Sequence, residues 1–537
     1  MVFCNVAVDI SHKILLQNIA FKVFDGSEQV VWISIINLLI IVPFLLLFSL
    51  SGFLSDKYHK KDVLIYGALS SFSLSVLMLI AYFIGSFYLA MATLFLLAIQ
   101  STIYSPAKFG IIIDIYGKSE LSKGNSSLQA VSIIAILVSM ATFSFIFESF
   151  FQFNNLETLN TKEELLKALL PLSLYVLPIA ILEMLVSFVV LKNIKTKVKR
   201  NKDLKLDLKA MFLGKLFKNN VQDIFKRKII LLCVLGLGLF WGISQGMIAT
   251  FPSYAKMYLG IEDVFVINGV IAASGIGIAL GSFFYSRYSK HYIEVGTIPF
   301  AALGMSIMIF ISTLVESASF LALSFLIFGF FGGLFVVPLN ALIQFNAPKK
   351  KLGTILAGNN WFHSLFMFFI LALTTTVSLY NLDPLNTIYL ILFLMCIGSL
   401  FVVVSLPQSM IIFFLKWLVG LKYKLEIQGV KYIPSSSGAL LLGNHISWLD
   451  WAVIYLATPR EIKFVMDKTI YSKWYLNWLM KLFKIIPIST KSSKKTIEIV
   501  AKELDEGNII VLFPEGSITR NGHLGEFKKG FEKILER

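Results

Sequence analysis

Charged residues and cysteines are scarce in this sequence. Of its 537 residues, 15% are Asp, Glu, Lys or Arg and 57% are hydrophobic, and the mean hydropathy is +0.77. Such a composition lies outside the range of soluble globular chains and places most of the chain in a lipid bilayer. The three cysteines, Cys4, Cys233 and Cys396, lie in apolar stretches without metal-site or disulfide spacing, so we interpret them as small core residues. No metal site is predicted, and residues 1–8 lack the features of a cleaved secretory signal.

Acidic residues are fewer than basic ones, which gives a formal net charge of +16. The basic residues stand in short runs between apolar segments and not on one face, so no nucleic-acid partner is expected. These runs occupy alternate loops, and the positive-inside rule puts such loops, together with both chain ends, in the cytoplasm. The runs are Lys57 with Lys60 and Lys61, Lys118 with Lys123, Lys192–Lys228, Arg287 with Lys290, and Lys349–Lys351.

Apolar runs of roughly 20 residues, the length that crosses a bilayer core, recur from residue 30 to about residue 406. We count about eleven clear spans and one polar candidate, Phe3–Phe24, or about twelve in all. The clear spans centre near Leu39, Leu74, Phe95, Ile136, Ile179, Leu237, Ile276, Met308, Ile327, Ile370 and Leu394. The predicted fold class is therefore a mostly α membrane protein.

Three pairs of matching residues indicate an internal repeat. Each pair is separated by about 230 residues, as expected for parallel transporter repeats of six helices. The pairs are Gly52 with Gly281, Pro106 with Pro338, and Asn125 with Asn359. We therefore divide the membrane part into two halves, 1–191 and 229–407, joined by a basic cytoplasmic linker, 192–228.

The chain changes character after Pro407. Residues 408–424 form an apolar segment with late lysines, which predicts an interfacial helix. In 425–537, short apolar runs alternate with helical patterns, which predicts an α/β domain. These runs are Ala439–Leu442, Lys463–Met466, Ile485–Ile488 and Ile509–Phe513. Between the second and third run, Trp474, Tyr475, Trp478, Leu479 and Leu482 form a stripe at helical spacing, which fits core packing or the membrane interface.

Two motifs follow apolar runs of this domain: Gly-Asn-His-Ile-Ser-Trp-Leu-Asp ending at Asp450, and Phe-Pro-Glu-Gly ending at Gly516. Acyl transfer to an alcohol needs a base, and His445 can supply it if Asp450 fixes its tautomer. Asn444 and Ser447 would brace the turn, and either could cap the helix that carries Asp450. An ordinary buried histidine is the plainer alternative.

These two motifs resemble the glycerolipid acyltransferase superfamily. The resemblance implies that His445 is the general base, that Asp450 orients it, and that Glu515 and Gly516 help to hold the acceptor. Ser517 stands where many members have Thr or Arg, and Arg520 is a candidate partner for the acceptor's phosphate or a plain surface residue. Another family block matches Ile485–Ser489 loosely, with Lys491 as its nearest basic residue. Members continue beyond their Glu-Gly block, so a domain truncated at its C-terminus is expected.

A loop after the first clear span resembles major facilitator transporters. Gly52 and Asp56, with Lys57, Lys60 and Lys61, match their loop between the second and third helices. The resemblance implies a latch for one state of alternating access, whereas a plain positive-inside anchor would explain the lysines alone. The fold implied is an approximately twelve-helix major facilitator fold in two six-helix halves, followed by a partial α/β acyltransferase domain.

Further motifs resemble the bacterial lysophospholipid transporters, whose partner is a 2-acylglycerophosphoethanolamine acyltransferase. The motifs are Tyr104–Gly110 with Pro106 and Lys108, Leu121–Asn125, Phe240–Gly242, and Val336–Leu342 with Pro338 and Asn340. Asn359, which matches Asn125 in the repeat, is a further transporter motif residue. In Phe3–Phe24, the polar residues lie within an arc of roughly 140° if the segment is helical. Ionisable residues at membrane depth usually line a cavity, so Asp9, His12 and Lys13 are candidates for a lipid headgroup path. The alternative is that this segment does not span the membrane.

The resemblances imply a bifunctional protein of the bacterial inner membrane with a cytosolic acyltransferase domain. It would import a lysophospholipid, most simply lysophosphatidylethanolamine, and re-acylate its free 1-position. The acyl donor would be a thioester of acyl carrier protein or coenzyme A, and no bound cofactor is expected. Two other readings remain: a transporter with an inactive acyltransferase remnant, and a multidrug exporter with an unrelated tail.

Overall fold

The computed structural model divides into two compact units. It describes residues 1–24, 26–156, 159, 161–193, 214–261, 264–289, 292–379, 383–434, 436–458, 460–488, 493–519, 523–528 and 530–536. The first unit, here the membrane unit, comprises Met1–Glu294 and Phe300–Val402. The second, here the C-terminal unit, comprises Val295–Pro299 and Val403–Arg537. Most of the predicted linker lies outside the described residues.

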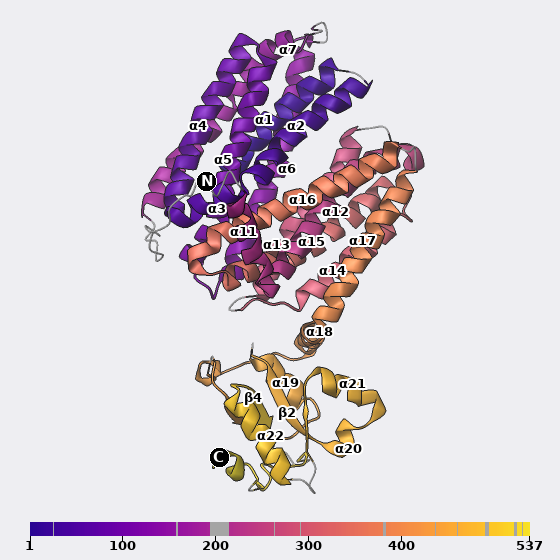
Figure 1. Cartoon of the computed structure of the whole chain (residues 1–537). Coiled ribbons are helices and arrows are strands. Elements are labelled where there is room, and N and C mark those ends of the chain that lie inside the picture. The colour runs from indigo at the N-terminus through magenta and orange to yellow at the C-terminus, as the bar shows by residue number, and fades with distance from the viewer. Residues whose placement is uncertain are drawn as a thin grey trace. The chain divides into compact units, whose positions relative to one another are not determined.

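The first half of the membrane unit is a bundle of long helices (Figure 1). Its elements are α1 Val2–Val23, α2 Gly26–Leu46, α3 Phe48–Lys57, α4 Lys60–Ile84, α5 Phe87–Tyr116, α6 Leu121–Phe153, α7 Lys162–Ala168, α8 Leu170–Leu174, α9 Val176–Val186 and η2 Ser187–Leu191. The Ser86 hydroxyl accepts a hydrogen bond from the Leu89 N–H at 3.3 Å and so caps α5. Gly85, with φ +81°, ends α4 in the left-handed conformation that favours glycine.

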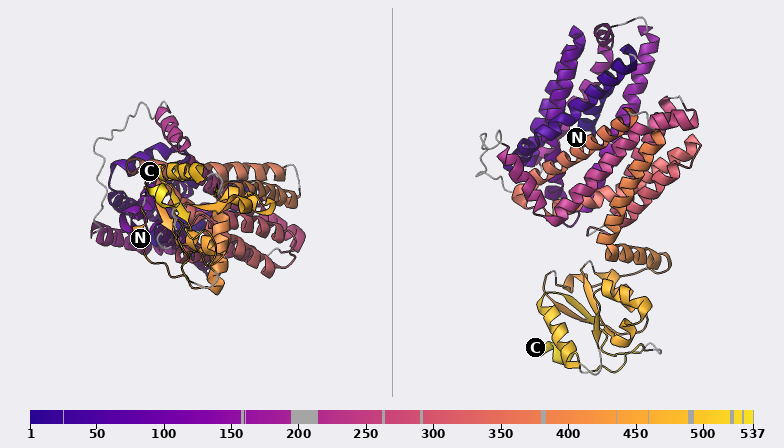
Figure 2. Two further views of the ribbon diagram at one scale, coloured as in Figure 1. Left: turned by 90° about the horizontal axis from the view of Figure 1, so that it is seen from below. Right: turned by 45° about the vertical axis from the view of Figure 1, so that its right-hand side comes forward.

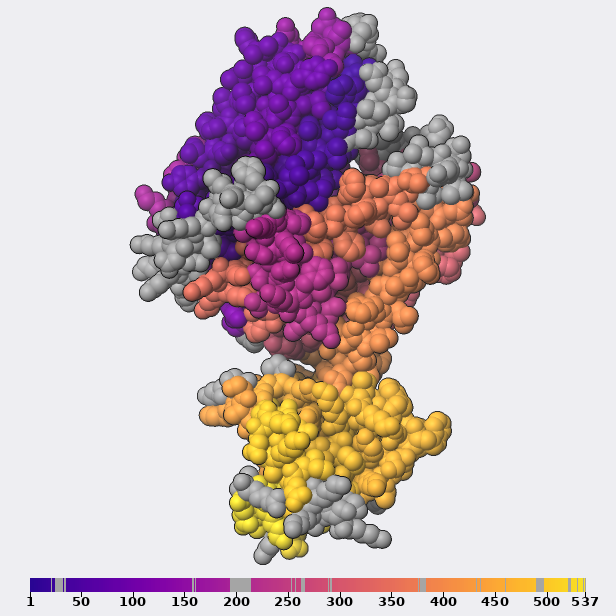
Figure 3. Space-filling model, viewed as in Figure 1, coloured from indigo at the N-terminus to yellow at the C-terminus, as the bar shows by residue number. Residues whose placement is uncertain are grey.

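The second half repeats this pattern after a short amphipathic helix. The elements are α11 Lys215–Phe225, α12 Lys228–Leu259, α13 Val264–Tyr288, α14 Thr297–Ser312, α15 Ala318–Asn346, η3 Lys349–Lys351, α16 Leu352–Leu379 and α17 Pro384–Ser405. Helix α11 lies in the last part of the predicted linker and packs on α3 and α16, so this part of the linker touches both halves (Figures 1 and 3).

The number of spans is close to the prediction. Among the described residues, nine helices are long and apolar enough to cross a membrane, and a tenth span results if α2 and α3, bent by 59°, count as one. All eleven predicted centres lie in helices, and α1 covers the polar candidate. The count of ten spans is two below the predicted twelve because α14 has only 16 residues and α1 carries polar side chains. Most of the predicted helices are thus present at the predicted places.

The three repeat pairs lie on helices that occupy equivalent places in the two halves. Gly52 lies on α3 and Gly281 on α13, each belonging to the second span of its half. The prolines lie within α5 and α15, and the asparagines lie in α6 and α16. The repeat seen in the sequence is therefore also a repeat of helix positions.

Apolar side chains both fill and coat the membrane unit. Tyr82 and Phe87 are fully buried, whereas Phe83 and Phe145 are 72% and 73% exposed. An outward apolar surface of this kind suits a lipid environment and not water. The expectation that all three cysteines are core residues is wrong for Cys396, which is exposed on α17, because the lipid-facing side of a span is as apolar as its core side.

The C-terminal unit begins with α18 (Pro407–Lys422), which has no buried residue, and continues as an α/β domain. Its further elements are η4 Val430–Tyr432, β1 Ala439–Leu442, α19 Asp450–Ala457, β2 Ile462–Asp467, α20 Lys468–Tyr471, α21 Trp474–Leu482, β3 Ile486–Ile488, α22 Ser493–Asp505, β4 Ile509–Leu512 and α23 Glu532–Leu535. The strands form one parallel sheet in the order β1-β4-β2-β3. The four predicted strand runs therefore match the four strands within one or two residues.

Alternating side chains of β4 build a core on each face of this sheet. Ile509 and Val511 pack with Tyr455 and Phe464 on one face, and Ile510 packs with Val500 of α22 on the other. Helices thus cover both faces, as a parallel sheet requires (Figure 2). Because β1 and β4 are neighbours, Leu442 pairs with Leu512, and the two motif segments that follow these strands emerge side by side.

The aromatic stripe of α21 is divided between two environments. Leu479 and Leu482 pack against the core, whereas Trp474, Tyr475 and Trp478 are 87%, 50% and 60% exposed. Of the two interpretations of the stripe, core packing is therefore wrong for these three aromatic side chains. A helix of nine residues has only one narrow face toward the sheet, so the larger rings point away from it.

Candidate functional site

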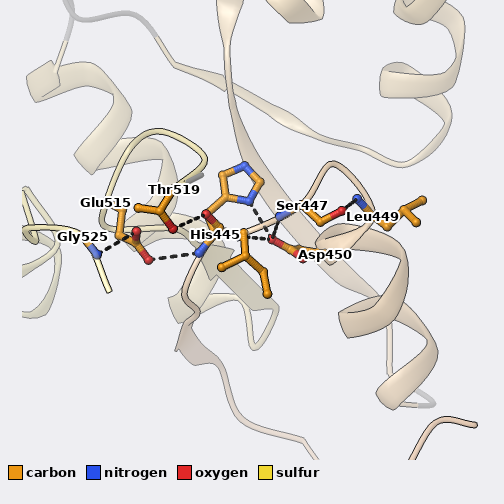
Figure 4. Close-up of polar contacts among 8 residues, drawn as sticks. His445, Ser447, Leu449, Asp450, Glu515, Thr519 and Gly525 are labelled. Carbon is orange, nitrogen blue, oxygen red and sulfur yellow. Dashed lines mark hydrogen bonds and ion pairs between the residues drawn. The ribbon is translucent and has the colours of Figure 1, made fainter. Parts of the chain in front are cut away.

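His445 and Asp450 form a hydrogen-bonded pair at the end of β1 (Figure 4). His445 lies in the loop after the strand, and Asp450 is the first residue of α19. The Nδ1 atom of His445 lies 2.9 Å from Oδ2 of Asp450. A carboxylate accepts, so Nδ1 carries the proton, and Nε2 is left with a free lone pair. The predicted base is therefore held in the tautomer that acyl transfer requires.

Asp450 also shapes the turn that carries the base. The same Oδ2 atom accepts hydrogen bonds from the N–H groups of Ile446 at 2.8 Å and Ser447 at 2.9 Å. The Ser447 hydroxyl accepts from the Leu449 N–H at 3.1 Å, so Ser447 does brace the turn, while Asn444 is exposed. The expected capping of the helix is wrong, because α19 has Leu449 at its N-cap position and no side-chain cap.

Glu515 joins the two motifs. It is 4% exposed, its Oε1 accepts the His445 N–H at 3.0 Å, and its Oε2 accepts the Gly525 N–H at 3.0 Å. From the other side, the Thr519 N–H donates to the His445 carbonyl at 2.8 Å. Both carboxylate oxygens are thus used within the chain, so Glu515 positions the base by holding its backbone. Its predicted contact with the acceptor stays a prediction.

Gly516 and Lys528 lie against one another beside this pair. Gly516 has φ +70°, and a Cβ built there would lie 2.5 Å from the Lys528 Nζ. Glycine is therefore favoured twice, by its backbone conformation and by the space that the ammonium fills. Ser517 is exposed and lines the same cavity as Gly516 and Lys528, while Arg520 lies outside the described residues.

A cavity of about 750 Å³ opens beside His445. The imidazole stacks on the Phe513 ring, with centroids 4.2 Å apart and planes at 15°. Most of the lining is apolar, and Lys528 is the one Lys or Arg among the described residues that line it. Apolar lining residues include Phe464, Met480, Phe483, Leu512, Phe531 and Ile534. An apolar cavity of this size with few polar groups suits a ligand that has a hydrocarbon chain.

Thr519 and Lys528 are site residues outside both motifs, and Phe513 is a site residue whose role the motifs did not reveal. Phe513 is the first residue of the second motif, but the motif gives no sign that its ring stacks on His445. Lys528 lies twelve residues after Gly516, in a Lys-Lys-Gly run. Nothing in its spacing indicates that the chain returns to Gly516.

In the membrane unit, Asp56 ties the two halves together at the end that carries the basic loops. Its carboxylate accepts the Gly353 N–H at 2.6 Å, the Thr354 N–H at 2.9 Å and the Thr354 hydroxyl at 2.7 Å. These donors lie at the start of α16, where backbone N–H groups lack partners within the helix. A Cβ on Gly52 would lie 2.6 Å from the Thr354 Cα, so Gly52 permits the close approach. The contact lies where the sequence predicts a latch, and its role in alternating access stays a prediction.

The lysines of this loop serve different purposes. Lys60 is buried and lies under Gly110, where a Cβ would meet its Cε at 2.5 Å, while Lys57 lies 5.3 Å from the Phe53 ring centroid. Lys61 also has an interaction partner within the chain. Nearby, Lys351 forms an ion pair with Asp223 of α11 at 2.5 Å. The lysines of this loop therefore also make contacts within the protein, which the positive-inside interpretation does not explain.

Asn125 adds a second link between the halves. Its side chain exchanges two hydrogen bonds with that of Gln344, at 3.1 and 2.8 Å, between α6 and α15. Asn340 bonds within its own helix, to the Val336 carbonyl at 3.1 Å. Asn359 and Tyr104 are buried, and the Asn359 Oδ1 and the Tyr104 hydroxyl have no partner among the described residues. Lys108 lies 5.5 Å from the Phe109 ring centroid.

The candidates on α1 lie inside the first half. The Asp9 carboxylate accepts a hydrogen bond from the Ser101 hydroxyl, and His12, which is 1% exposed, lies 3.4 Å from the Ser75 hydroxyl. Lys13 is partly buried. The Asp9 Oδ1 and His12 Nδ1 atoms are buried without a partner among the described residues. The helix is thus polar on an inner side, and the headgroup path stays a prediction.

The repeated bundle and the histidine–aspartate cavity define a multi-pass membrane transporter fold joined to an α/β domain of acyltransferase type. The protein-family model of the Major Facilitator Superfamily matches residues 3–372 of the sequence, so the chain belongs to that superfamily. The model described as Acyltransferase matches residues 424–537. Both predicted resemblances and the predicted fold class are confirmed.

Solved structures support the fold of the membrane unit. The human organic anion transporter MFSD10 aligns with a TM-score of 0.58 at 14% identity, over 75% of this chain and 97% of its own. The transporter FucP in its outward conformation aligns with a TM-score of 0.56 at 12% identity, over the same shares. At these identities the likeness concerns the fold alone.

Curated relatives match the two parts separately. The lysophospholipid transporter LplT of Photorhabdus laumondii is 26% identical over 349 residues, which is 64% of this chain and 79% of that protein. The 1-acyl-sn-glycerol-3-phosphate acyltransferases of Arabidopsis thaliana (chloroplastic LPAT1) and Borreliella burgdorferi are 29% and 28% identical over 112 and 121 residues. Those matches cover 20% and 22% of this chain and 31% and 48% of the two enzymes. The chain therefore spans a third to a half of the acyltransferases that it matches.

Proposed function

We propose that this protein moves a lysophospholipid across a bacterial inner membrane and acylates its free hydroxyl from an acyl thioester. The membrane unit would perform the movement and the C-terminal unit the acylation on the cytosolic side. The observation that carries the enzymatic part is the His445 Nδ1 to Asp450 Oδ2 hydrogen bond, which leaves Nε2 free beside an apolar cavity.

The chemistry requires only groups of this site. The acceptor's hydroxyl would lie at His445 Nε2, which takes its proton as the oxygen attacks the thioester carbonyl. When the tetrahedral intermediate collapses, the C–S bond breaks, and the imidazolium returns the proton to the leaving thiolate. Asp450 accepts from Nδ1 throughout and stabilises the transient positive charge. The acyl ester and the free thiol are the products, so the base ends as it began.

The acceptor's phosphate would lie near Gly516, Ser517 and Lys528. The bare face of Gly516 admits the Lys528 ammonium, which lines the cavity together with His445. A cation favours a phosphate, and both lysophosphatidylethanolamine and 1-acylglycerol-3-phosphate carry one. We propose lysophosphatidylethanolamine as the acceptor, because it suits a chain that also moves lysophospholipid, as the name of its LplT relative states for that protein. The thioester would be that of acyl carrier protein or coenzyme A.

Transport is supported by features of the membrane unit itself. Asp56 and the Asn125–Gln344 pair bind the halves at the end of the basic loops, which closes that end. A closed end of this kind is one state of an alternating-access cycle. Asp9, His12 and Lys13 supply polar groups inside the first half that could meet a headgroup.

The test uses vesicles that contain the full chain, labelled lysophosphatidylethanolamine and the thioester of acyl carrier protein or coenzyme A. We expect lipid uptake and conversion to diacyl lipid, with conversion abolished and uptake retained in His445→Ala. His523→Ala, a change of another exposed histidine of this unit, is the matched control and should convert normally. Uptake without conversion in the wild type would leave the transport-only reading, and conversion of 1-acylglycerol-3-phosphate alone would change the acceptor. Drug export without lipid uptake would overturn the proposal.

A further inference from the structure

Four aromatic rings surround one lysine ammonium at the end of the first half. The Lys162 Nζ lies 4.6 Å from the ring centroid of Tyr88, 5.0 Å from that of Trp32, 5.6 Å from that of Phe87 and 5.7 Å from that of Phe24. It also donates a hydrogen bond to the Tyr88 hydroxyl at 3.2 Å. We call Phe24, Trp32, Phe87 and Tyr88 the aromatic cage.

The rings hold each other in place without the lysine. Trp32 stacks on Phe24 at 5.5 Å and meets Phe87 edge-on at 5.7 Å between centroids. Phe87 is fully buried, and Phe24 and Trp32 pack against the core of the first half. Tyr88 is 61% exposed and forms the outer wall. The four rings are therefore held in place around one point, and Tyr88 is their exposed member.

Ring faces attract cations, and several faces around one ammonium are the usual device for binding a ligand of that kind. Lys162 comes from α7, whereas the rings come from the end of α1, from α2 and from the start of α5. The side chain of Lys162 is long and partly exposed, so it can leave without displacing a core residue. Because the rings already surround the primary ammonium of Lys162, a ligand group of the same charge and size would fit between them.

The cage lies far from the latch. Phe87 and Gly110 are separated by 23 residues of α5, about 35 Å along a helix, and Gly110 packs on Lys60 beside the latch. Figure 1 shows α7 at the end of the bundle opposite to α3. If the basic loops are cytoplasmic, the cage faces the other side of the membrane, from which an imported lipid arrives.

We propose that the aromatic cage binds the primary ammonium of an ethanolamine phospholipid headgroup, with Lys162 as its displaceable occupant. When the headgroup enters, the Lys162 ammonium leaves the rings and pairs with the headgroup's phosphodiester, so each charge keeps a partner. This inference rests on the proposed lysophospholipid transport and adds a headgroup preference to it. A lysophospholipid without an ammonium, such as lysophosphatidylglycerol, gains nothing from the rings.

The first experiment compares uptake of lysophosphatidylethanolamine and lysophosphatidylglycerol into vesicles that contain the full chain. We expect Tyr88→Leu and Trp32→Leu to reduce ethanolamine-lipid uptake about tenfold and to leave glycerol-lipid uptake unchanged, which also shows that the variants fold. Tyr175→Leu, which removes a tyrosine of similar exposure (60%), is the matched control and should alter neither. An equal loss for both lipids, or no loss, would overturn the cage as a headgroup site.

The second experiment separates this inference from the proposed function. Calorimetry measures binding of glycerophosphoethanolamine and glycerophosphoglycerol to the purified full chain, to Tyr88→Leu and to Lys162→Met. We expect Lys162→Met, which keeps all four rings and has no competing ammonium, to bind the ethanolamine compound about tenfold more tightly than Tyr88→Leu, which keeps the competitor and loses a ring. If the wild type moves neither lipid, the proposed transport fails, yet this binding still supports the cage. Absence of binding to Lys162→Met would contradict it.

Discussion

Both units use a carboxylate that accepts several N–H groups, but they use it for different purposes. In the membrane unit, Asp56 joins residues nearly 300 positions away, Gly353 and Thr354, and so binds one half to the other. In the C-terminal unit, Asp450 accepts from residues three to five positions away and fixes a turn. In the proposed function, alternating access would break the first set of bonds in each cycle, whereas catalysis would need the second set intact. The same chemistry would therefore serve as a reversible latch in one unit and as a permanent brace in the other.

The largest expected effect is that of Asp450→Asn. The amide has one acceptor oxygen, and its NH2 group faces N–H donors, so the tautomer of His445 and the turn are both lost. We expect acyl transfer to fall about a thousandfold, with lysophospholipid uptake unchanged, measured in the same vesicles. Asp505→Asn, an exposed aspartate of α22, should transfer acyl groups normally. A parallel loss of uptake would show that the brace also serves transport.

A smaller effect is expected for Gly516→Ala. The new Cβ would lie 2.5 Å from the Lys528 Nζ at a φ of +70°, so the ammonium must move and the backbone is strained. The strain costs about 1–2 kcal/mol, and the KM for the acceptor should rise about tenfold with a smaller change in kcat. Gly420→Ala, at a helical position with open space around it, is the control for both kinetic constants. An unchanged KM would remove Lys528 from the acceptor site.

Asp56→Ala tests the proposed latch. The start of α16 loses three hydrogen bonds, a change typical of a lost helix cap worth about 0.5–2 kcal/mol, so the closed state of that end should be populated severalfold less. We expect the rate of lysophospholipid uptake to fall about fivefold while acyl transfer stays at its wild-type rate. Asp56→Asn keeps one acceptor oxygen and should give an intermediate uptake rate. Equal uptake by all three proteins would mean that Asp56 is only an anchor.

The smallest effect is expected for Lys351→Met. The ion pair with Asp223 is short at 2.5 Å, but the two side chains are 51% and 20% exposed, so solvent screens it. Pairs of this kind contribute about 0–1 kcal/mol, and uptake should change by less than about twofold. Raising the salt concentration should reduce the difference between variant and wild type further. A larger change in uptake would mean that the Lys351–Asp223 pair belongs to the latch together with Asp56.

Much of the fold could be predicted because its apolar runs are well separated. The four strands were predicted within two residues, since Gly, Pro or polar residues stand near their ends. A latch at Asp56 was expected from resemblance and not from physics, and it stays a prediction. For the aromatic side chains of α21, the spacing of Trp474 and Trp478 fits a core stripe as well as an outward face, so the sequence could not decide between the two.

The candidate site could be predicted only where its residues are local. His445 and Asp450 lie five positions apart, so a turn suffices to bring them together. Lys528 is held beside Gly516 by its N–H, which donates to the Pro514 carbonyl at 3.0 Å, and by the nearby bond of Gly525 to Glu515, and no spacing rule encodes these bonds. The bond of the Glu515 carboxylate to the His445 N–H likewise depends on the pairing of β1 with β4.

The sheet order β1-β4-β2-β3 has a consequence for how the protein is made. The strand at 509–512 inserts between two strands that are synthesised earlier, and Glu515 follows it. A ribosome adding roughly 5 to 20 residues per second completes the helices up to Ser405 on the order of ten seconds before this strand exists. Until β4 is made, the His445 N–H lacks its acceptor Glu515, and the edges of β1 and β2 that pair with β4 have no partner. In the proposed function, translation would therefore complete the transporting unit before the acylating one.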